Sequence, residues 1–263
     1  MRAVATAVRL AAAVLTTAGL WTAALACGTT QPATEQLRVQ VLATLPHDTT
    51  MYTQGLEIHE GVLYEGSGLI AQSRVRATAL SNAAVLREAT LPAPLFGEGL
   101  TVADDRLWQL TWKSGTAIER DPATLSERRR VSYRGEGWGL CHDGDRLVMS
   151  DGSDRLTFRD PVTFEPTGQV VVRLDGEPVR KLNELECVGG VVWANVYQDD
   201  RILRIDPGSG AVTGVVKASG LLSDPPKSAS DVLNGIAAIP GTDEFLVTGK
   251  NWPSLFRVRF VPS

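Results

Sequence analysis

Side chains that can move protons or donate hydrogen bonds recur in short, similar motifs along the chain. Each motif centres on an aliphatic residue, and the polar or aromatic residues just before it are Gln54, Glu98, Trp138, Asn183, Glu184 and Asn234. A second group stands where we expect the following strand to end, and it comprises Glu65, Trp112, Asp151, Asn195 and Lys250. Carboxyl groups, amides and an amine brought together could transfer protons and stabilise an oxyanion, while the indoles could wall a pocket.

Other kinds of site find little support in the residue types. His47, His59 and His142 are far apart and lack the spacing of metal ligands, so we expect no zinc site and no Ser-His-Asp triad. The formal net charge of −4 disfavours a nucleic-acid partner, which normally meets a basic surface. The one basic run, at 128–130, fits the solvated edge of a sheet.

The motifs repeat with a period typical of β-propeller blades. Their aliphatic residues, Leu56, Leu100, Leu140, Leu185 and Ile236, are separated by 44, 40, 45 and 51 residues. A period of about 40–45 residues is the length of one four-stranded blade. Strand-like segments follow each motif, and no long helical pattern occurs. The sequence therefore predicts an all-β, five-bladed β-propeller of four-stranded antiparallel blades, with an all-β sandwich or barrel as the alternative.

The two ends of the repeating region complement each other. The last repeat has only three strands before Ser263, whereas the strand-like segment 37–45 precedes the first motif. We predict that this N-terminal strand closes the last blade, because pairing the ends removes an exposed edge. In a propeller, the starts of the innermost strands and the ends of the second strands meet at one mouth. The candidate residues should therefore converge there, unless the Asn and Asp side chains only bond turn backbones.

The N-terminal segment has the composition of an export signal. Residues 1–26 carry early arginines and an apolar stretch that ends in small residues at Ala24 and Ala26, as a signal peptide does. Cys27 follows at once and resembles the lipidated cysteine of bacterial lipoproteins. We expect 27–36 to be a tether and 37–263 to be the propeller domain. Simple secretion and an uncleaved anchor are the alternatives, and each predicts export, with membrane contact only through this segment.

Two features stay open at the level of sequence. Cys141 and Cys187 could pair in an oxidising compartment, or remain as two buried thiols. The polar insertion at 221–231 could be a lid beside the site or a solvated connection.

Six strings in order resemble the plant and bacterial glutamine cyclotransferase family over about residues 45–260. They are Tyr52-Thr53-Gln54-Gly55-Leu56, Phe96-Gly97-Glu98-Gly99-Leu100-Thr101, Gly137-Trp138-Gly139-Leu140, Leu182-Asn183-Glu184-Leu185-Glu186, Asp231-Val232-Leu233-Asn234-Gly235-Ile236 and Thr248-Gly249-Lys250-Asn251-Trp252-Pro253. The resemblance implies an acyltransferase that converts the N-terminal glutamine of peptides or proteins to pyroglutamate and releases ammonia. It implies no metal and no other cofactor, and we expect a monomer.

The resemblance also implies roles for individual residues. Glu65, in Leu63-Tyr64-Glu65-Gly66-Ser67-Gly68, would carry a proton from the attacking amine to the leaving nitrogen. Gln54, Asn183 and Lys250 would complete the catalytic set by holding the amide or its oxyanion. The implied substrate-binding residues are Trp112, Trp138, Tyr52, Glu98 and Asn195. The chain departs from the family at Tyr52, where Phe is usual, and at Tyr197, where Trp is common, which bears on substrate preference.

Two other functions compete at this level. A propeller lactonase or related hydrolase would hold Ca²⁺ among oxygen ligands, for which Glu98, Asn183, Asn195 and Asp151 are candidates. A non-catalytic propeller would present its surface to a partner. Metal dependence separates the first from cyclisation, and turnover of a small glutaminyl substrate separates the second.

Overall fold

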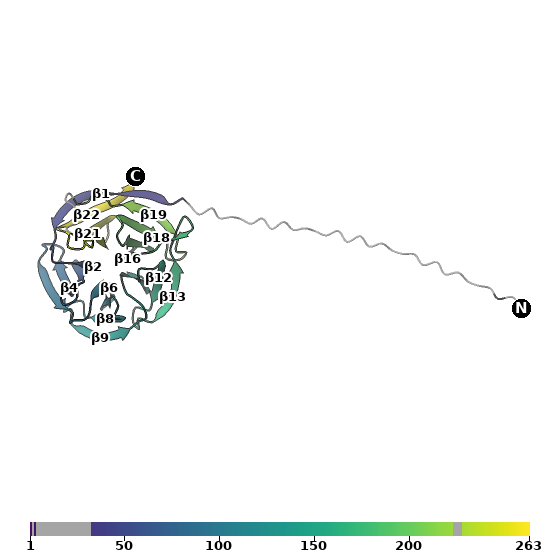
Figure 1. The fold of residues 1–263 in the computed structure, drawn as a ribbon, viewed down its shortest axis with the longest axis horizontal. Coiled ribbons are helices and arrows are strands. Elements are labelled where there is room, and N and C mark those ends of the chain that lie inside the picture. Colours follow the sequence, from purple (N-terminus) through teal and green to yellow (C-terminus); the bar gives the residue numbers. More distant parts are fainter. Residues whose placement is uncertain (2, 4–32, 223–227) are drawn as a thin grey trace. The chain divides into compact units, whose positions relative to one another are not determined.

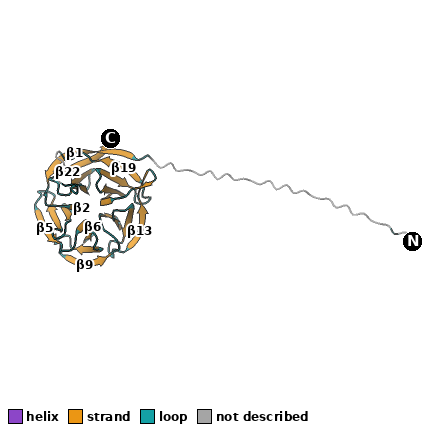
Figure 2. Ribbon diagram, in the orientation of Figure 1, coloured by secondary structure: helices purple, strands orange, loops and turns teal. Residues whose placement is uncertain are grey.

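The computed structural model describes residues 1, 3, 33–222 and 228–263 (Figure 1). The chain divides into Met1–Pro32 and a compact unit, Ala33–Ser263, and only the second is described further. Most of the predicted signal peptide, Cys27, most of the predicted tether and part of the 221–231 insertion lie outside the described residues. Within the described ranges the unit consists of strands and loops (Figure 2). No helix among them has the length and apolar character needed to cross a membrane.

Three sheets contain four antiparallel strands each, in simple chain order. The first sheet comprises β2 (Thr53–His59), β3 (Val62–Ser67), β4 (Arg74–Ala79) and β5 (Val85–Thr90). The second comprises β6 (Gly97–Ala103), β7 (Arg106–Thr111), β8 (Thr116–Arg120) and β9 (Glu127–Ser132). The third comprises β10 (Leu140–Asp143), β11 (Arg146–Ser150), β12 (Arg155–Arg159) and β13 (Pro166–Val171).

The remaining long strands form one eight-stranded sheet in the order β16-β17-β18-β19-β1-β22-β21-β20. Its strands are β16 (Leu182–Val188), β17 (Val191–Val196), β18 (Arg201–Ile205), β19 (Val212–Lys217), β1 (Glu35–Pro46), β22 (Ser254–Pro262), β21 (Glu244–Gly249) and β20 (Leu233–Ala238). A two-stranded hairpin, β14 (Arg173–Leu174) and β15 (Glu177–Pro178), precedes β16. All the sheets lie around a common centre (Figure 1).

Strand β1 closes the ring, as predicted, and also makes a contact that the sequence did not predict. It runs antiparallel to β22, from Leu37 opposite Pro262 to Pro46 opposite Ser254. The start of β1 also pairs in parallel with β19, which belongs to the preceding four-stranded set. The strand begins at Glu35, two residues before the predicted start, because these residues take part in the second pairing.

The inner and outer strands differ sharply in burial. Inner strands β2, β6, β10, β16 and β20 each pack against the next, and β20 packs against β2. Strand β6 is buried at every position, whereas almost every residue of edge strand β9 is exposed. The basic run at 128–130 lies in β9 and forms ion pairs with acidic neighbours, so its assignment to a solvated edge is confirmed.

The motif glycines let neighbouring inner strands approach closely. A Cβ atom on Gly55 would lie 2.6 Å from the backbone nitrogen of Leu100, and one on Gly99 would lie 2.6 Å from the carbonyl oxygen of Trp138. At Gly139 the added atom would overlap the carbonyl oxygen of Asn183. The recurring glycine is thus explained by backbone packing around the centre of the ring rather than by ligand contact.

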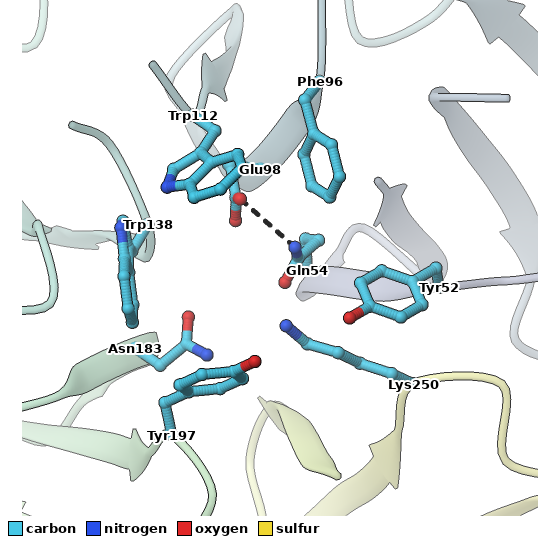
Figure 3. A pocket seen from close by; sticks show the side chains of 9 residues that line it. All are labelled: Tyr52, Gln54, Phe96, Glu98, Trp112, Trp138, Asn183, Tyr197 and Lys250. Atoms are coloured by element: carbon cyan, nitrogen blue, oxygen red, sulfur yellow. Dashed lines mark hydrogen bonds between the residues drawn. The ribbon is translucent and has the colours of Figure 1, made fainter. Parts of the chain in front are cut away.

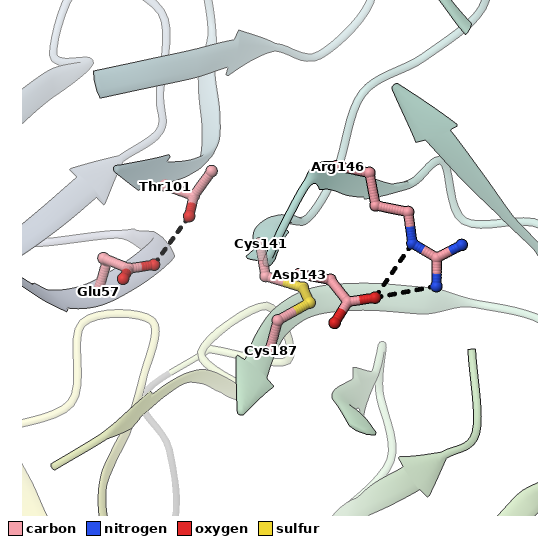
Figure 4. Close-up of a disulfide and its surroundings, with 6 residues drawn as sticks. All are labelled: Glu57, Thr101, Cys141, Asp143, Arg146 and Cys187. Atoms are coloured by element: carbon pink, nitrogen blue, oxygen red, sulfur yellow. Dashed lines mark hydrogen bonds and ion pairs between the residues drawn. A yellow bond between two sulfur atoms is a disulfide. The ribbon is translucent and has the colours of Figure 1, made fainter. Parts of the chain in front are cut away.

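A disulfide joins Cys141 in β10 to Cys187 in β16, with their Cα atoms 5.4 Å apart (Figure 4). The bond therefore links the inner strands of two neighbouring sheets. Of the two states that the sequence left open, the structure has the paired one.

Candidate active site

A cavity of about 180 Å³ collects most of the candidate residues (Figure 3). It is lined by Tyr52, Gln54, Phe96, Glu98, Trp112, Trp138, Asn183, Tyr197 and Lys250. The structure thus brings together seven of the nine residues that the sequence proposed for catalysis or binding, and it adds Phe96 and Tyr197.

The cavity residues come from two kinds of position, as the propeller argument predicts. Gln54, Glu98 and Asn183 are each the second residue of an inner strand. Tyr52, Phe96 and Trp138 lie just before inner strands. Trp112, Tyr197 and Lys250 each follow the last residue of a second strand. Antiparallel pairing places these starts and ends at the same edge of each sheet.

Glu98 and Lys250 are the buried ionisable groups of the cavity. Glu98 is 5% exposed and Lys250 is 4% exposed. Burial raises the pKa of Glu98 well above its usual value, although the charge of Lys250 opposes the change. Burial lowers the pKa of Lys250 to about 8, and here the charge of Glu98 acts in the opposite direction. The cavity therefore offers a carboxyl group that favours its protonated form more than usual and an amine with a pKa of about 8.

The amide of Gln54 has a fixed orientation beside Glu98. Its Nε2 donates to Glu98 Oε1 at 3.2 Å, while its Oε1 accepts from Asn234 Nδ2 at 3.3 Å. Asn234 Nδ2 also donates to the carbonyl oxygen of Thr53 at 3.0 Å. Asn234 therefore lies behind the cavity and directs the amide nitrogen of Gln54 towards Glu98.

Aromatic rings surround these polar groups. The ring centres of Phe96 and Trp112 are 5.5 Å apart, and those of Trp138 and Tyr197 are 5.6 Å apart. Lys250 Nζ lies 4.9 Å from the ring centre of Tyr52 and 5.1 Å from that of Tyr197. Aromatic faces attract cations at such distances, so the same walls suit an amine of a ligand.

Comparison with known proteins gives matches over most of the chain. A family model described as glutamine cyclotransferase matches residues 12–260. A glutaminyl-peptide cyclotransferase of Arabidopsis thaliana is 39% identical over 227 residues, which cover 84% of this chain and 71% of that protein. The crystal structure of Myxococcus xanthus glutaminyl cyclase superposes with a TM-score of 0.80 at 38% identity, covering 88% of this chain and 99% of the other.

The chain belongs to the glutamine cyclotransferase family.

Glu65 does not line the cavity of this glutamine cyclotransferase, so the structure does not place it with the other residues of the predicted catalytic set. Glu65 Oε1 accepts from Thr53 Oγ1 at 2.6 Å and lies 3.0 Å from His47 Nε2. Burial lowers the pKa of His47, but the hydrogen bond and charge of Glu65 outweigh it and raise that pKa overall. Glu65 is thus part of a buried pair outside the cavity, and Glu98 is the carboxyl group inside it.

The position of Glu65 inside β3 explains why its side chain does not line the cavity. The second strands β7, β17 and β21 contribute to the cavity through the residue after their end, and in the first sheet the residue at that position is Gly68. A side chain at Gly68 would overlap the ring of Phe96, so Phe96 fills this position from the neighbouring strand. Glu65 lies two residues before the end of β3.

Asn195 also does not line the cavity, and its binding role stays a prediction. It lies before the end of β17, is fully buried, and its Oδ1 accepts from the backbone nitrogen of Gly235 at 2.9 Å. Asp151 Oδ1 accepts from the backbone nitrogen of Ser153 at 3.0 Å. Of the four oxygen ligands of the alternative Ca²⁺ site, only Glu98 and Asn183 line the cavity. Within the described ranges, no group of three or more His, Cys, Asp or Glu could hold a metal ion.

Sequence reasoning missed Phe96 and Tyr197 as cavity residues, although the repeat contained the signal for both. Phe96 stands two residues before Glu98, as Tyr52 stands two residues before Gln54. Tyr197 follows the end of β17, as Trp112 follows the end of β7. The starts of the inner strands thus carry the signal for Phe96, and the ends of the second strands carry the signal for Tyr197.

Proposed function

We propose that this chain is a glutaminyl-peptide cyclotransferase, an acyltransferase that closes an N-terminal glutamine into pyroglutamate and releases ammonia. The observation that carries the proposal is a buried carboxyl group, Glu98, which shares an aromatic cavity with Lys250 and with the amides of Gln54 and Asn183. The names of the two relatives support the same reaction.

The reaction forms one bond and breaks one bond at the side-chain amide carbon of the substrate. The α-amine attacks that carbon, and the amide oxygen takes up negative charge. A proton then passes from the attacking nitrogen to the departing nitrogen, which leaves as ammonia. Because the nucleophile belongs to the substrate, the protein has to fold the substrate into attack geometry and move this proton.

Glu98 is the cavity group suited to the proton transfer. Burial raises its pKa and so favours the protonated carboxyl, which can give a proton to the leaving nitrogen. The carboxylate that results can take the proton of the attacking nitrogen, which restores the starting state. No other carboxyl group lines the cavity among the described residues.

Lys250, Gln54 and Asn183 are suited to stabilise the charge on the amide oxygen. Each presents nitrogen-bound hydrogens to the cavity, and preorganised donors of this kind stabilise an oxyanion strongly where water is excluded. With a pKa of about 8, Lys250 is mostly charged at neutral pH. The surrounding rings suit the amine of the substrate and exclude water.

We further propose that the ring is a five-bladed propeller in which the eight-stranded sheet counts as two blades joined at β1. Three four-stranded sheets and the two halves of that sheet support this count. We also propose export, with Cys27 as the lipidated residue, and a monomeric state. The composition of residues 1–26 and the Cys141–Cys187 disulfide support an oxidising location.

The test is a comparison of Glu98→Gln with Glu65→Gln, measured as ammonia release from a glutamine-initiated dipeptide in the presence of a chelator. Glu98→Gln keeps the shape of the side chain but cannot move the proton, so kcat should fall by about 10²–10⁴-fold. Glu65→Gln preserves a hydrogen-bond acceptor outside the cavity and should retain kcat close to the unmutated value.

The opposite ranking of the two variants would restore Glu65 and remove Glu98 from the mechanism. An unmutated protein that releases no ammonia would overturn the proposed function and leave the binding propeller. Activity that the chelator abolishes would favour the metal-dependent hydrolase.

A further inference from the structure

One carboxylate oxygen of Glu136, which lies outside the cavity, accepts a hydrogen bond from each of two tryptophans that line it. Trp112 Nε1 donates to Glu136 Oε2 at 2.7 Å, and Trp138 Nε1 donates to the same atom at 3.0 Å. Figure 3 shows both indole nitrogens on the side of the rings that faces away from Lys250. The hydrogen bonds therefore act behind the walls and leave the ring faces to the cavity.

The two tryptophans come from different sheets, so Glu136 links two parts of the ring. Trp112 follows β7 of the second sheet, whereas Trp138 precedes β10 of the third. The backbone supports the link, because the nitrogen of Gly137 donates to the carbonyl oxygen of Trp112 at 3.0 Å. The short segment that carries Glu136 is thus fastened beside both rings.

The surroundings keep Glu136 suited to accept two hydrogen bonds. Its side chain is 38% exposed, and Lys113 Nζ lies 3.8 Å from its other oxygen. Lys113 Nζ also lies 4.1 Å from the ring centre of Trp112. Hydrogen bonds to an ionised acceptor are about twice as strong as neutral ones, so each bond restrains the rotation of its indole.

We propose that Glu136 is a positioning residue that fixes Trp112 and Trp138 in the orientation that receives the glutamine side chain and amine of the substrate. The proposal rests on the proposed function for the identity of the substrate. Glu136 itself touches neither substrate nor reacting atoms, since it does not line the cavity. Its loss should widen the range of ring orientations and weaken substrate binding more than the chemical step.

The experiment compares Glu136→Ala, Glu136→Gln and the control Glu127→Ala by steady-state ammonia release. Glu127 lies in β9 of the second sheet, has a side chain 37% exposed, and pairs with Arg130 away from the cavity. Glu136→Ala should raise KM about tenfold with a smaller change in kcat, as expected from the loss of two hydrogen bonds. Glu136→Gln keeps an acceptor oxygen and should recover most of the loss, and Glu127→Ala should match the unmutated protein.

Combination with Trp138→Phe makes the test specific to the hydrogen bond. Trp138→Phe keeps an aromatic wall but removes one donor, so Glu136→Ala should cost less in this background than alone. An unchanged KM in Glu136→Ala would overturn the proposal. Equal losses in Glu136→Ala and Glu136→Gln would also overturn it, because they would assign the effect to charge rather than to the shared acceptor.

A readout independent of turnover separates this inference from the proposed function. The near-ultraviolet circular dichroism of Glu136→Ala should differ from that of the unmutated protein, and Glu136→Gln should restore the signal. An unmutated protein that releases no ammonia would overturn the proposed function alone, whereas identical spectra of all variants would overturn the positioning role. If Glu136→Ala does not fold, Trp138→Phe is compared with Glu136→Gln instead. Trp138→Phe removes one hydrogen bond to Glu136 and should raise KM, whereas Glu136→Gln keeps the acceptor and should raise it less; equal KM values would overturn the proposal.

Discussion

Reducing the Cys141–Cys187 disulfide should lower the free energy of unfolding by about 4 kcal/mol. The two cysteines are 46 residues apart in sequence, and the segment between them includes most of the third sheet. In the chain-entropy description, closing a loop of this length restricts the unfolded chain by about 4 kcal/mol at 25 °C. Domains have total stabilities of roughly 5–15 kcal/mol, so this is a large share.

The assay is denaturant unfolding followed by tryptophan fluorescence, with and without a reductant. The oxidised protein should unfold at a clearly higher midpoint, and a Cys141→Ala/Cys187→Ala double variant should not respond to reductant. Free energies of oxidised and reduced protein within about 1 kcal/mol of each other would refute the loop argument. They would mean that residual structure already restricts the reduced unfolded chain, so that the bond adds little.

Three further predictions follow from buried groups. Lys250→Met should lower kcat for ammonia release by about 10²–10³-fold because an oxyanion donor is lost, and an unchanged kcat would exclude that role. Gly139→Ala should prevent soluble folding because its Cβ atom would overlap the backbone of β16, which expression and circular dichroism would show; a normally folded variant would contradict the packing. Burial, followed by the charges of Glu57 and Glu184, raises the pKa of Glu186 well above 4.5, so its protonated form is favoured by folding. The contribution of Glu186 to stability should therefore fall as pH rises above about 4.5. Glu186→Gln should stabilise the protein at about pH 7.5 but not at about pH 4. Unfolding midpoints of the variant and the unmutated protein that are equal to each other at both pH values would contradict this.

The repeat explains why much of the fold could be predicted. The aliphatic residues from Leu56 to Ile236 mark the inner strands, and the shortage of one strand at the C-terminal end predicts the role of β1. The parallel pairing of β1 with β19 could not be predicted from the repeat. It depends on how far the outer strand extends past its own sheet, which no periodicity encodes.

The candidate site was predictable as a set of positions but not in every residue. Glu65 and Asn195 were predicted at the mouth but do not line the cavity, because sequence patterns locate strands better than strand ends, and the side chains of a strand alternate between faces. Gly68 stands where a side chain was expected, and Phe96 takes its space. The disulfide depended on the distance between β10 and β16, which the sequence did not contain.

The pairing of β1 with β22, the first and last strands of the compact unit, has a practical consequence. Leu37 lies opposite Pro262, and the backbone nitrogen of Ser263 donates to the carbonyl oxygen of Gln36 at 3.1 Å. Fluorescent labels placed on β1 near Leu37 and on β22 near Pro262 would therefore be close in the closed ring. They would separate as soon as β1 detaches from β22. Their energy transfer would report opening of the ring directly, independently of catalysis and of the tryptophan signal.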